Sequence, residues 1–325
     1  MKISVAMCTY NGAAFLPAQL ESITAQSRNP DEIVVCDDGS TDQTKTLLEN
    51  FAQTSSIPVS LTFNQQNLGS IRNFEQAIRL CSGDVIVLSD QDDVWHTDKL
   101  EKIEQAFNTT PTAGLVFSDA EIVDENLEPL NRRMWDEVGF DAHKKNLLRQ
   151  GRALEVLITG WTVTGATMAF RSEFMRLSLP IPERIAMIHD GWIALTIAAV
   201  AGVVPIEEPL IKYRQHAQQQ IGAPGQAQKA VDQAGPVQAL RRRNSSADLH
   251  KILTTLEERL LTQGNSYDTR KALLFAADYS FHLNVRANLP QNRLNRVPSI
   301  LRELLTRRYH EYANGFKSAA KDLVS

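Results

Sequence analysis

The sequence predicts an α/β fold with an open, mostly parallel sheet flanked by helices, followed by a helical C-terminal extension. Over the first hundred residues, short β-prone runs alternate with stretches whose apolar residues recur at helical spacing. With 325 residues and 43% hydrophobic content, the chain can bury one sizeable core and a smaller second one. We therefore expect two domains, residues 1–225 and residues 226–325.

The expected elements of the first hundred residues follow one another as strand, helix, strand. The apolar runs predict strands over residues 3–7, 32–36, 59–63 and 84–88. Helical spacing predicts helices over residues 13–26, 41–51 and 70–81. Ser40 or Thr41 is the expected N-cap of the second helix. Because the fourth strand is apolar throughout, we expect helices on both faces of a parallel sheet.

The later part of the chain has a less regular pattern. After residues 114–117 the pattern becomes mixed. We expect polar loops over residues 119–155, a strand over residues 161–170 interrupted by Gly165, and a helix over residues 188–201. Residues 218–235 are rich in Gln, Ala and Gly and are expected to be flexible. From residue 237 onward the sequence is helical in character, with breaks expected at Pro290 and Pro298.

Charge is unevenly distributed along the chain. The net charge of −4 argues against a nucleic-acid-binding protein. From Lys229 onward there are 16 Lys and Arg residues against 9 Asp and Glu residues, so this tail carries +7 and the preceding body −11. A basic tail on an acidic body favours either contact with an anionic membrane surface or an ordinary solvated helical face.

The cysteines and the apolar segments bear on the compartment. Cys8, Cys36 and Cys81 are an odd set without metal-site spacing, which indicates free buried thiols and a reducing compartment. The N-terminal apolar stretch is too short for the core of a signal peptide. No segment has the roughly 18 to 20 apolar residues of a spanning helix. We therefore expect a cytoplasmic protein, at most peripheral to the inner face of the membrane.

Polar clusters follow each of the four predicted parallel strands. They comprise residues 9–11, 37–40, 64–69 and 89–93. The carboxyl ends of parallel strands lie at one edge of a sheet, and open sheets bind ligands there. A single cluster is typical of a turn, whereas four in succession predict a shared site.

Asp90, Gln91 and Asp92 form the sharpest motif. Two carboxylates one residue apart can bind one divalent cation, and Mg²⁺ or Mn²⁺ prefers oxygen ligands and bridges readily to phosphate. Such a cation neutralises the charge that develops on a departing diphosphate. The alternative is an acidic loop or a helix cap. The buried strand before the motif and Trp95 after it favour the metal site.

Other polar residues suit a bound nucleotide diphosphate. Asp38 can accept hydrogen bonds from a pyrimidine or a ribose, and Arg72 and Arg214 can contact phosphate. His216 can complete a metal shell as a neutral imidazole. The plainer alternatives are a capping aspartate and ordinary surface residues.

Asp190 is the candidate general base. It lies at the start of a predicted helix, where a carboxylate is stabilised, although a plain cap would look the same. Displacing a nucleotide diphosphate with inversion needs one base to take the proton of the incoming hydroxyl. Trp95, Trp161 and Trp192 flank these motifs, and their rings either stack on an acceptor sugar or pack in the core.

Together these residues resemble the inverting family 2 glycosyltransferases of the GT-A fold. The resemblance rests on residues 9–12, 37–42, 67–69, 89–95 and 189–192, in that order, and covers about residues 1–216. The forms Ser-Asp-Gln-Asp-Asp-Val-Trp at 89–95 and Tyr-Arg-Gln-His at 213–216 are similar to a bacterial rhamnosyltransferase-like branch. Members of that branch build surface polysaccharides, such as O-antigen, from dTDP-sugars.

The resemblance implies a nucleotide diphosphate-sugar donor, a Mg²⁺ or Mn²⁺ cofactor, and a glycan or lipid-linked acceptor. It implies a metal held by Asp90, Asp92 and His216, with Asp190 as the catalytic base. The expected donor contacts are Thr9, Tyr10, Asn11, Asp38, Ser40, Asn67, Gly69, Arg72, Asp90, Gln91 and Arg214. The expected acceptor contacts are Trp95, Trp161, Gly165, His189 and Trp192. His189 stands where many members carry Glu, so we expect it to alter the pKa of the base or its acceptor contacts.

Several alternatives stay open. The expected donor is dTDP-rhamnose, and the alternative is UDP-glucose, UDP-galactose or UDP-N-acetylglucosamine. Nucleotidyl transfer is disfavoured because residues 9–12 contain no basic side chain, and a dehydrogenase because no G-x-G-x-x-G follows the first strand. A non-catalytic protein that binds sugar nucleotides or glycans is disfavoured by the presence of both Asp92 and Asp190. For the tail, membrane docking and homodimer formation are both open.

Overall fold

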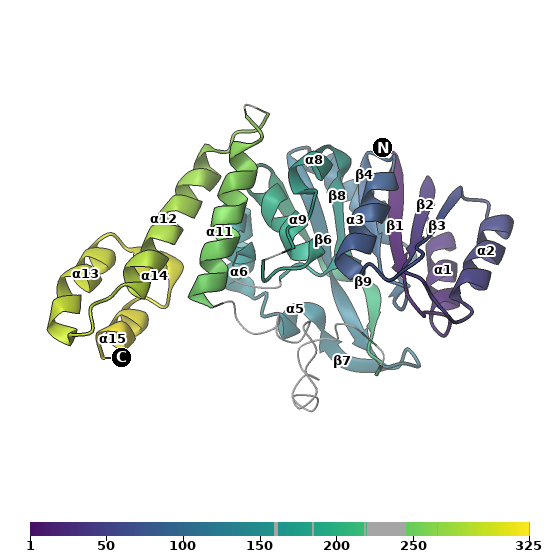
Figure 1. Cartoon of the computed structure of the whole chain (residues 1–325). Helices are drawn as coiled ribbons and strands as arrows, with labels where there is room; N and C mark the ends of the chain where they lie inside the picture. Colours follow the sequence, from purple (N-terminus) through teal and green to yellow (C-terminus); the bar gives the residue numbers. More distant parts are fainter. Residues whose placement is uncertain (159–161, 184, 218, 220–244, 265, 325) are drawn as a thin grey trace. The chain divides into compact units, whose positions relative to one another are not determined.

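The computed structural model describes residues 1–158, 162–183, 185–217, 219, 245–264 and 266–324. The chain divides into two compact units, whose elements are labelled in Figure 1. One unit comprises residues 1–183 and 187–243, and the other residues 184–186 and 244–325. The expected domain boundary, between residues 225 and 226, lies outside the described residues, as does most of the stretch expected to be flexible.

Parallel strands form the N-terminal half of the sheet in the first unit. Its elements are, in chain order, β1 (Ile3–Thr9), α1 (Leu16–Thr24), β2 (Glu32–Asp37), α2 (Thr44–Thr54), β3 (Val59–Phe63), α3 (Ser70–Leu80) and β4 (Val85–Ser89). β1 pairs in parallel with β2 and β4, and β2 pairs in parallel with β3. The alternation expected from hydrophobic periodicity is confirmed, and the carboxyl ends of these four strands lie at one edge.

The other half of the first unit makes the sheet mixed. Its main elements are β5 (Val94–Trp95), α4 (Lys99–Thr109), β6 (Ala113–Val123), β7 (Pro129–Arg133), α5 (Met134–Glu137), α6 (Ala142–Arg149), α7 (Ala153–Leu157), β8 (Met168–Arg171), α8 (Met175–Ser178), α9 (His189–Ala198) and β9 (Gly202–Arg214). The strand order is β3-β2-β1-β4-β8-β6-β9-β5, and β7 pairs with β6. β8 is antiparallel to β4 and β6, whereas β9 is parallel to β6. A mixed α/β sheet flanked by helices confirms the predicted fold class.

Two expectations for this half are wrong. Residues 119–155 are not loop-like, because they contain the end of β6, strand β7 and helices α5 to α7. β7 pairs only with β6 and faces water at several positions, so its sequence lacks the apolar pattern of a buried strand. The strand expected over residues 161–170 is wrong for residues 162–167, which end in a 3-10 turn at Gly165–Thr167, and is confirmed only from Met168, where β8 begins.

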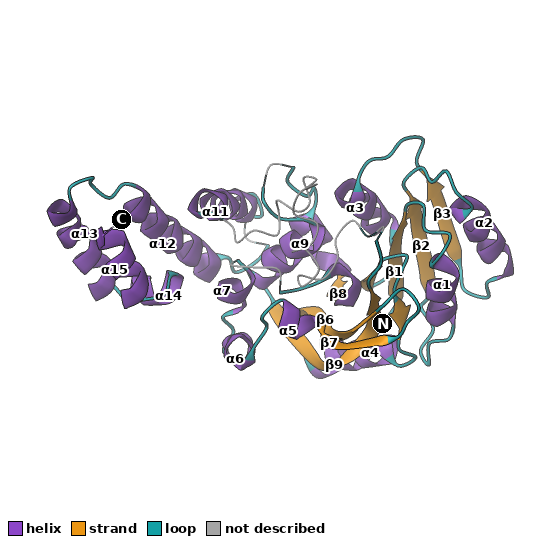
Figure 2. Ribbon diagram, turned by 90° about the horizontal axis from the view of Figure 1, so that it is seen from below, coloured by secondary structure: helices purple, strands orange, loops and turns teal. Residues whose placement is uncertain are grey.

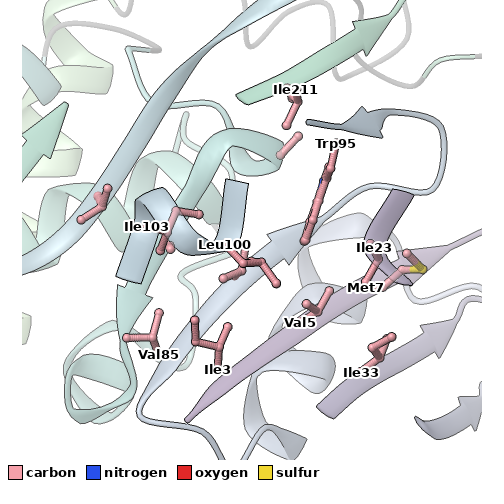
Figure 3. Packing of buried hydrophobic residues seen from close by; sticks show 14 of the residues in the cluster. Ile3, Val5, Met7, Ile23, Ile33, Val85, Trp95, Leu100, Ile103 and Ile211 are labelled. Atoms are coloured by element: carbon pink, nitrogen blue, oxygen red, sulfur yellow. The ribbon is translucent and has the colours of Figure 1, made fainter. Parts of the chain in front are cut away.

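The sheet carries apolar packing on both faces. Alternate residues of β1 point to opposite faces. Ile3, Val5 and Met7 belong to a buried cluster with residues of α1, α2 and α4 (Figure 3). Figure 2 shows α3 and α9 on the opposite side of the sheet. This coverage of both faces explains why every residue of β1 is buried. The three cysteines are buried free thiols, as expected.

The second unit is helical. Its helices are α11 (Ser246–Leu261), α12 (Arg270–Ala287), α13 (Arg293–Leu305), α14 (Arg308–Tyr312) and α15 (Phe316–Val324). A small core forms around Ile300, Tyr309 and Ala319. The expected break at Pro290 is confirmed between α12 and α13, but the expected break at Pro298 is wrong, because α13 continues through it. Pro298 removes only the hydrogen bond to the Leu294 carbonyl, near the exposed start of the helix.

Candidate active site

Direct hydrogen bonds join the loops at the carboxyl ends of the parallel strands. The Thr9 hydroxyl at the end of β1 donates to Asp37 Oδ2 at the end of β2, over 2.7 Å. The Tyr10 amide donates to Gln91 Oε1 over 2.8 Å, and Gln91 Nε2 donates back to the Tyr10 carbonyl over 3.1 Å. The loops after β1, β2 and β4 therefore form one assembly, and Tyr10 remains exposed beside it.

Asn11 and Ser40 connect the first two loops a second time. The Asn11 amide donates to Ser40 Oγ over 2.8 Å, and Asn11 Oδ1 accepts from the Thr41 amide over 2.8 Å. The Ser40 hydroxyl in turn donates to Asp37 Oδ2 over 2.5 Å. The expectation that Ser40 or Thr41 caps the next helix is wrong, because α2 begins only at Thr44 and the Ser40 side chain is engaged in this loop contact.

Asp38 holds the loop that follows β3. Its Oδ1 accepts from the Leu68 amide over 2.8 Å, and its Oδ2 accepts from the Gly69 amide over 2.9 Å. Asn67 Oδ1 also accepts from the Gly69 amide, over 3.0 Å. Gly69 has a φ of 82°, which a residue with a Cβ rarely adopts. Asp38 thus places Asn67 and Gly69 at the same edge as the other loops, with its own carboxylate buried beneath them.

Arg72 is engaged with acidic side chains. Its guanidinium lies 2.6 Å from Glu75 Oε2 and 2.6 Å from Glu183 Oε1. These contacts raise the pKa of Arg72 above its usual value, with Glu183 the leading cause. Because both of these partners are carboxylates, a phosphate contact requires the guanidinium to exchange partners.

Acidic side chains crowd the loop after β4. Burial and, to a smaller extent, the charges of Asp92 and Asp190 together raise the pKa of Asp90 to about 7. Burial also raises the pKa of Asp93, and the charges of Asp92 and Asp90 add to the effect. Asp93 Oδ1 accepts from the Arg214 amide over 3.1 Å, whereas Asp93 Oδ2 is buried with no hydrogen-bond partner among the described residues. The loop therefore concentrates carboxyl groups where water is scarce, which disfavours their charged forms.

The end of β9 brings His216 to this acidic loop from 124 positions along the chain. His216 Nε2 lies 2.8 Å from Asp92 Oδ2. Arg214 fixes the approach, because its Nε donates to the Asp92 carbonyl over 2.7 Å. The His216 ring also packs against Phe15, with 4.3 Å between ring centroids. The structure thus brings together His216, Arg214 and the Asp-x-Asp motif, which the sequence only suggested.

The chemistry of these side chains suits a divalent cation. In the described part of the chain, no group of three or more His, Cys, Asp or Glu side chains is arranged as a ready metal site. However, Asp92 and His216 already touch, and burial with two neighbouring carboxylates raises the pKa of Asp90 although Lys99 opposes the shift, so added positive charge would be accommodated there. Oxygen ligands and an imidazole match the preferences of Mn²⁺ and, for the oxygens, of Mg²⁺.

Asp190 is fixed by backbone amides at the start of α9. Its Oδ2 accepts from the Gly165 amide over 2.9 Å, and its Oδ1 accepts from the Gly191 amide over 2.6 Å. Burial raises the pKa of Asp190 above its ordinary value, although the amides and His189 oppose the shift. A buried carboxylate with a raised pKa in a polar cluster has the properties of a general base.

His189 lies beside this carboxylate as a buried neutral ring. It stacks on Phe74 with ring centroids 4.2 Å apart, and burial lowers its pKa. Its Nδ1 is buried without a hydrogen-bond partner among the described residues. A Cβ on Gly165 would lie 3.1 Å from His189 Nε2, so the glycine allows the turn to approach the ring closely. The expected acceptor residues Gly165 and His189 are therefore neighbours of Asp190.

The tryptophans do not form the expected platform. Trp192 is fully buried, and its indole N–H donates to the Ser178 carbonyl over 2.8 Å. Trp95 is buried in the core cluster (Figure 3). Neither ring presents a face to an acceptor, which corrects that expectation in favour of core packing. Trp161 lies outside the described residues.

Lys99 is a residue of the site that the sequence analysis missed. It is fully buried, its Nζ donates to the Ala166 carbonyl over 2.7 Å, and it lies 3.9 Å from the centroid of the Trp95 ring. Burial lowers the pKa of Lys99 to about 7, although Asp93 and Asp90 oppose the shift. The burial of Lys99 could have been predicted from helical spacing, because Lys99 lies four residues before Ile103 and so on the apolar face of α4. Lys99 ties the start of α4 to the turn that holds Asp190.

Comparison with known proteins identifies a family. The model of glycosyl transferase family 2 matches residues 4–176. A glycosyltransferase of Nostoc sp. is 30% identical over 66% of this chain and 65% of its own length. A dTDP-rhamnosyl transferase of Shigella flexneri is 26% identical over 67% of this chain and 74% of its own length. Two further relatives, from Haemophilus influenzae and Bacillus subtilis, are matched over only 41% and 43% of their lengths.

Solved structures share the fold at low sequence identity. TarS of S. aureus in complex with UDP-GlcNAc has a TM-score of 0.58 at 15% identity, covering 99% of this chain and 91% of that one. A mannosyltransferase of Pyrobaculum calidifontis, in complex with GDP-Man and Mn²⁺, has a TM-score of 0.51 at 20% identity, covering 87% of this chain and 80% of that one. These likenesses support the α/β architecture described above.

Proposed function

The chain belongs to glycosyl transferase family 2, and we propose that it transfers a sugar from a nucleotide diphosphate donor to an acceptor hydroxyl with inversion. The observation that carries this proposal is the position of Asp190. Two backbone amides hold its carboxylate, and its charge acts on Asp90 of the Asp-x-Asp motif. A base close to a diphosphate-binding acidic loop is what an inverting transfer requires.

The donor is proposed to lie along the edge formed by the four loops. Tyr10, Asn11 and Asn67 are exposed there, so they are available to the base and ribose. Thr9, Asp38, Ser40 and Gly69 act mainly by fixing these loops. Gln91 holds Tyr10 from the neighbouring loop. Arg214, which contacts the Asp92 carbonyl, is the proposed cation for the diphosphate, and Arg72 is a second one after exchanging its carboxylate partners.

A divalent cation is proposed to bind at Asp90, Asp92 and His216. When bound, Mg²⁺ or Mn²⁺ supplies positive charge that stabilises the departing diphosphate. Arg214 orients the loop by its bond to the Asp92 carbonyl. His216 must present a neutral Nε2 to a metal, so the tautomer with the proton on Nδ1 is required.

The chemical step assigned to this chain's residues is one proton transfer. The acceptor oxygen forms a bond to the anomeric carbon while the bond between that carbon and the diphosphate oxygen breaks. The proton of the acceptor hydroxyl passes to the Asp190 carboxylate, which its two amide donors keep aimed. His189 and Gly165 border this position and are the proposed acceptor contacts.

The proposed donor is dTDP-rhamnose, used in bacterial surface polysaccharide synthesis at the inner face of the cell membrane. The Shigella relative, a dTDP-rhamnosyl transferase, supports this choice. TarS binds UDP-GlcNAc, which favours a UDP-sugar as the alternative. None of the described helices is long and apolar enough to cross a bilayer. The acceptor is proposed to be a glycan or a lipid-linked glycan.

Thermal unfolding with nucleotides and Mn²⁺ tests the proposal. A ligand at about 100 times its dissociation constant stabilises a protein by about 2.7 kcal/mol. We expect dTDP and dTDP-rhamnose to raise the unfolding temperature in Mn²⁺ and to do so less in EDTA. A response to UDP-sugars alone replaces the donor and keeps the activity. The absence of any response to nucleotide diphosphates in Mn²⁺ refutes the proposed donor site.

A further inference from the structure

Large apolar side chains are exposed mainly in the helical unit. Eight of the thirteen exposed large hydrophobic residues of the described chain lie between residues 261 and 324. The most exposed are Leu305, Leu294 and Leu274, at 84%, 79% and 72%. An isolated exposed leucine is ordinary, but a gathering of them indicates a surface that contacts something other than water.

On helix α13 the exposed residues form one stripe. Leu294, Pro298, Leu301 and Leu305 are separated by four, three and four positions, which places them on a single face of a helix. This face is opposite the one that packs into the unit, where Glu303 is buried and Ile300 enters the small core. The stripe is therefore not part of the core of the helical unit. Below, "the α13 stripe" means these four residues.

The charge around the α13 stripe is positive. Residues 293–324, which span helices α13 to α15, contain seven Arg and Lys residues and three acidic ones. Two of the acids are paired with cations inside the unit: Glu303 with Arg308 at 3.1 Å, and Asp322 with Arg286 at 2.6 Å. Glu303 also lies 2.7 Å from His282 Nδ1.

The outward cations are left without such partners. Arg293, Arg302, Arg307, Lys317 and Lys321 are exposed and form no ion pair within the described residues. Arg293 and Arg302 flank the α13 stripe on its two sides when helix positions are advanced by 100° each. The surface therefore combines protruding leucines with uncompensated positive charge.

We propose that the α13 stripe docks on an anionic lipid bilayer, with α13 lying in the plane of the membrane. At 13 residues, α13 is about 20 Å long, too short to cross a hydrocarbon core of about 30 Å. An apolar stripe bordered by arginines matches the boundary between acyl chains and anionic headgroups. A second copy of the chain fits less well, because a two-fold contact through the stripe would bring the same arginines together.

This inference deepens the proposed function, on which its biological meaning rests, because a lipid-linked acceptor would lie in the same bilayer. The binding itself is independent of sugar transfer. Lipid binding is measured by co-sedimentation with vesicles, and donor binding is measured by nucleotide-induced thermal stabilisation. Either proposal can therefore fail while the other holds.

The test is co-sedimentation of the full chain with vesicles. We expect at least tenfold more bound protein with vesicles of 30 mol% phosphatidylglycerol in phosphatidylcholine than with phosphatidylcholine alone. The triple variant Leu294→Ser, Leu301→Ser, Leu305→Ser is expected to lose at least about tenfold of this binding. The variant Arg293→Gln, Arg302→Gln is expected to lose most of the preference for phosphatidylglycerol. All variants should retain the nucleotide-induced shift of the parent protein.

A matched control uses exposed leucines of the same unit that lie outside α13. Leu261→Ser with Leu274→Ser should change vesicle binding by less than about twofold, because neither residue belongs to the stripe. Equal binding by the parent and the triple variant overturns the proposal. So does a light-scattering mass that falls from dimer to monomer in the triple variant without any lipid dependence, which would assign the stripe to a second copy.

Discussion

Replacing Asp190 by Asn separates the chemical role of this residue from its structural role. In the parent protein each carboxylate oxygen accepts a backbone amide, Oδ2 from Gly165 and Oδ1 from Gly191. Asn has the same shape but only one accepting oxygen. Its NH₂ group would face the other amide, so one buried N–H would lose its partner.

Two opposing effects set the change in stability. An unpaired buried N–H costs about 1–3 kcal/mol. Removing the charge works in the other direction, because burial raises the pKa of Asp190 and so makes its ionised form costly. The free energy of unfolding of Asp190→Asn should therefore fall by no more than about 3 kcal/mol. The variant stays folded at neutral pH and can be assayed.

The pH dependence of this difference follows from the sign of the shift. The folded-state pKa of Asp190 lies above its unfolded value, so its contribution to stability is present at low pH and lost as the pH rises through the folded pKa. Asn does not titrate. The free energy of unfolding of Asp190→Asn should thus fall furthest below that of the parent in acid, and the difference should shrink toward neutral pH. Urea titrations at several pH values would measure it.

The effect on activity should be much larger than the effect on stability. General base catalysis contributes about 10² to 10⁴-fold, so kcat should fall by that factor. The dissociation constant for the donor nucleotide should stay within about threefold, since the base acts on the acceptor. Initial rates and calorimetric titration with nucleotide and Mn²⁺ measure the two quantities. In the parent, the acidic limb of kcat/KM should lie above the ordinary Asp pKa of about 4.

Asp84→Asn is the matched control. Asp84 Oδ2 also accepts a backbone amide, from Lys2 over 2.8 Å, but at the opposite edge of the sheet, beside the start of β4. It should leave kcat unchanged. The assignment of Asp190 as base is refuted if Asp190→Asn keeps kcat within about fivefold of the parent, or if the folded variant loses donor binding instead.

Three further changes test other parts of the structure. Asp92→Ala should abolish the difference between Mn²⁺ and EDTA in nucleotide titrations, because it removes the carboxylate that contacts His216; an unchanged titration would contradict the metal assignment. Lys99→Met should lower kcat by about tenfold with donor binding unchanged, because it frees the Ala166 carbonyl beside the turn that holds the base, and Lys99→Arg should recover part of it. Glu303→Ala should destabilise the helical unit by about 1–3 kcal/mol, because it leaves the buried His282 ring, whose pKa burial lowers, without its hydrogen-bond partner; hydrogen exchange in α12 measures this, and unchanged protection would show that the pair is dispensable.

Hydrophobic periodicity was sufficient to predict the four parallel strands at the start of the chain and the helices between them. Residues 1–89 alternate between buried strands and helices with one apolar face, so local sequence and tertiary environment agree. The prediction failed where packing is one-sided. β7 shows this, because it pairs only with β6 and has an exposed start, which leaves no apolar alternation to read.

The site was predictable where its residues follow the strands. Thr9, Asp38 and Asp92 were placed correctly at one edge because parallel strands share an edge. The orientation of individual side chains was not accessible in this way. Trp192 looked like an acceptor platform because it lies two residues after Asp190, but its ring is fully buried in the core. Arg72 likewise contacts Glu183, which only the tertiary fold brings near it.

Lys99 shows most clearly what sequence reading misses. A lysine on the apolar face of a predicted helix contradicts the hydrophobic pattern unless the tertiary structure supplies polar partners for its ammonium group. Here the buried ammonium counters the charge of Asp90 and Asp93 and bonds to the Ala166 carbonyl, next to the glycine that holds Asp190. Burying a lysine and several carboxylates destabilises a fold, and this protein places that cost in the loops that also hold its candidate base. The same argument explains why a divalent cation should stabilise the first unit, since it would supply the positive charge that Lys99 alone provides only in part.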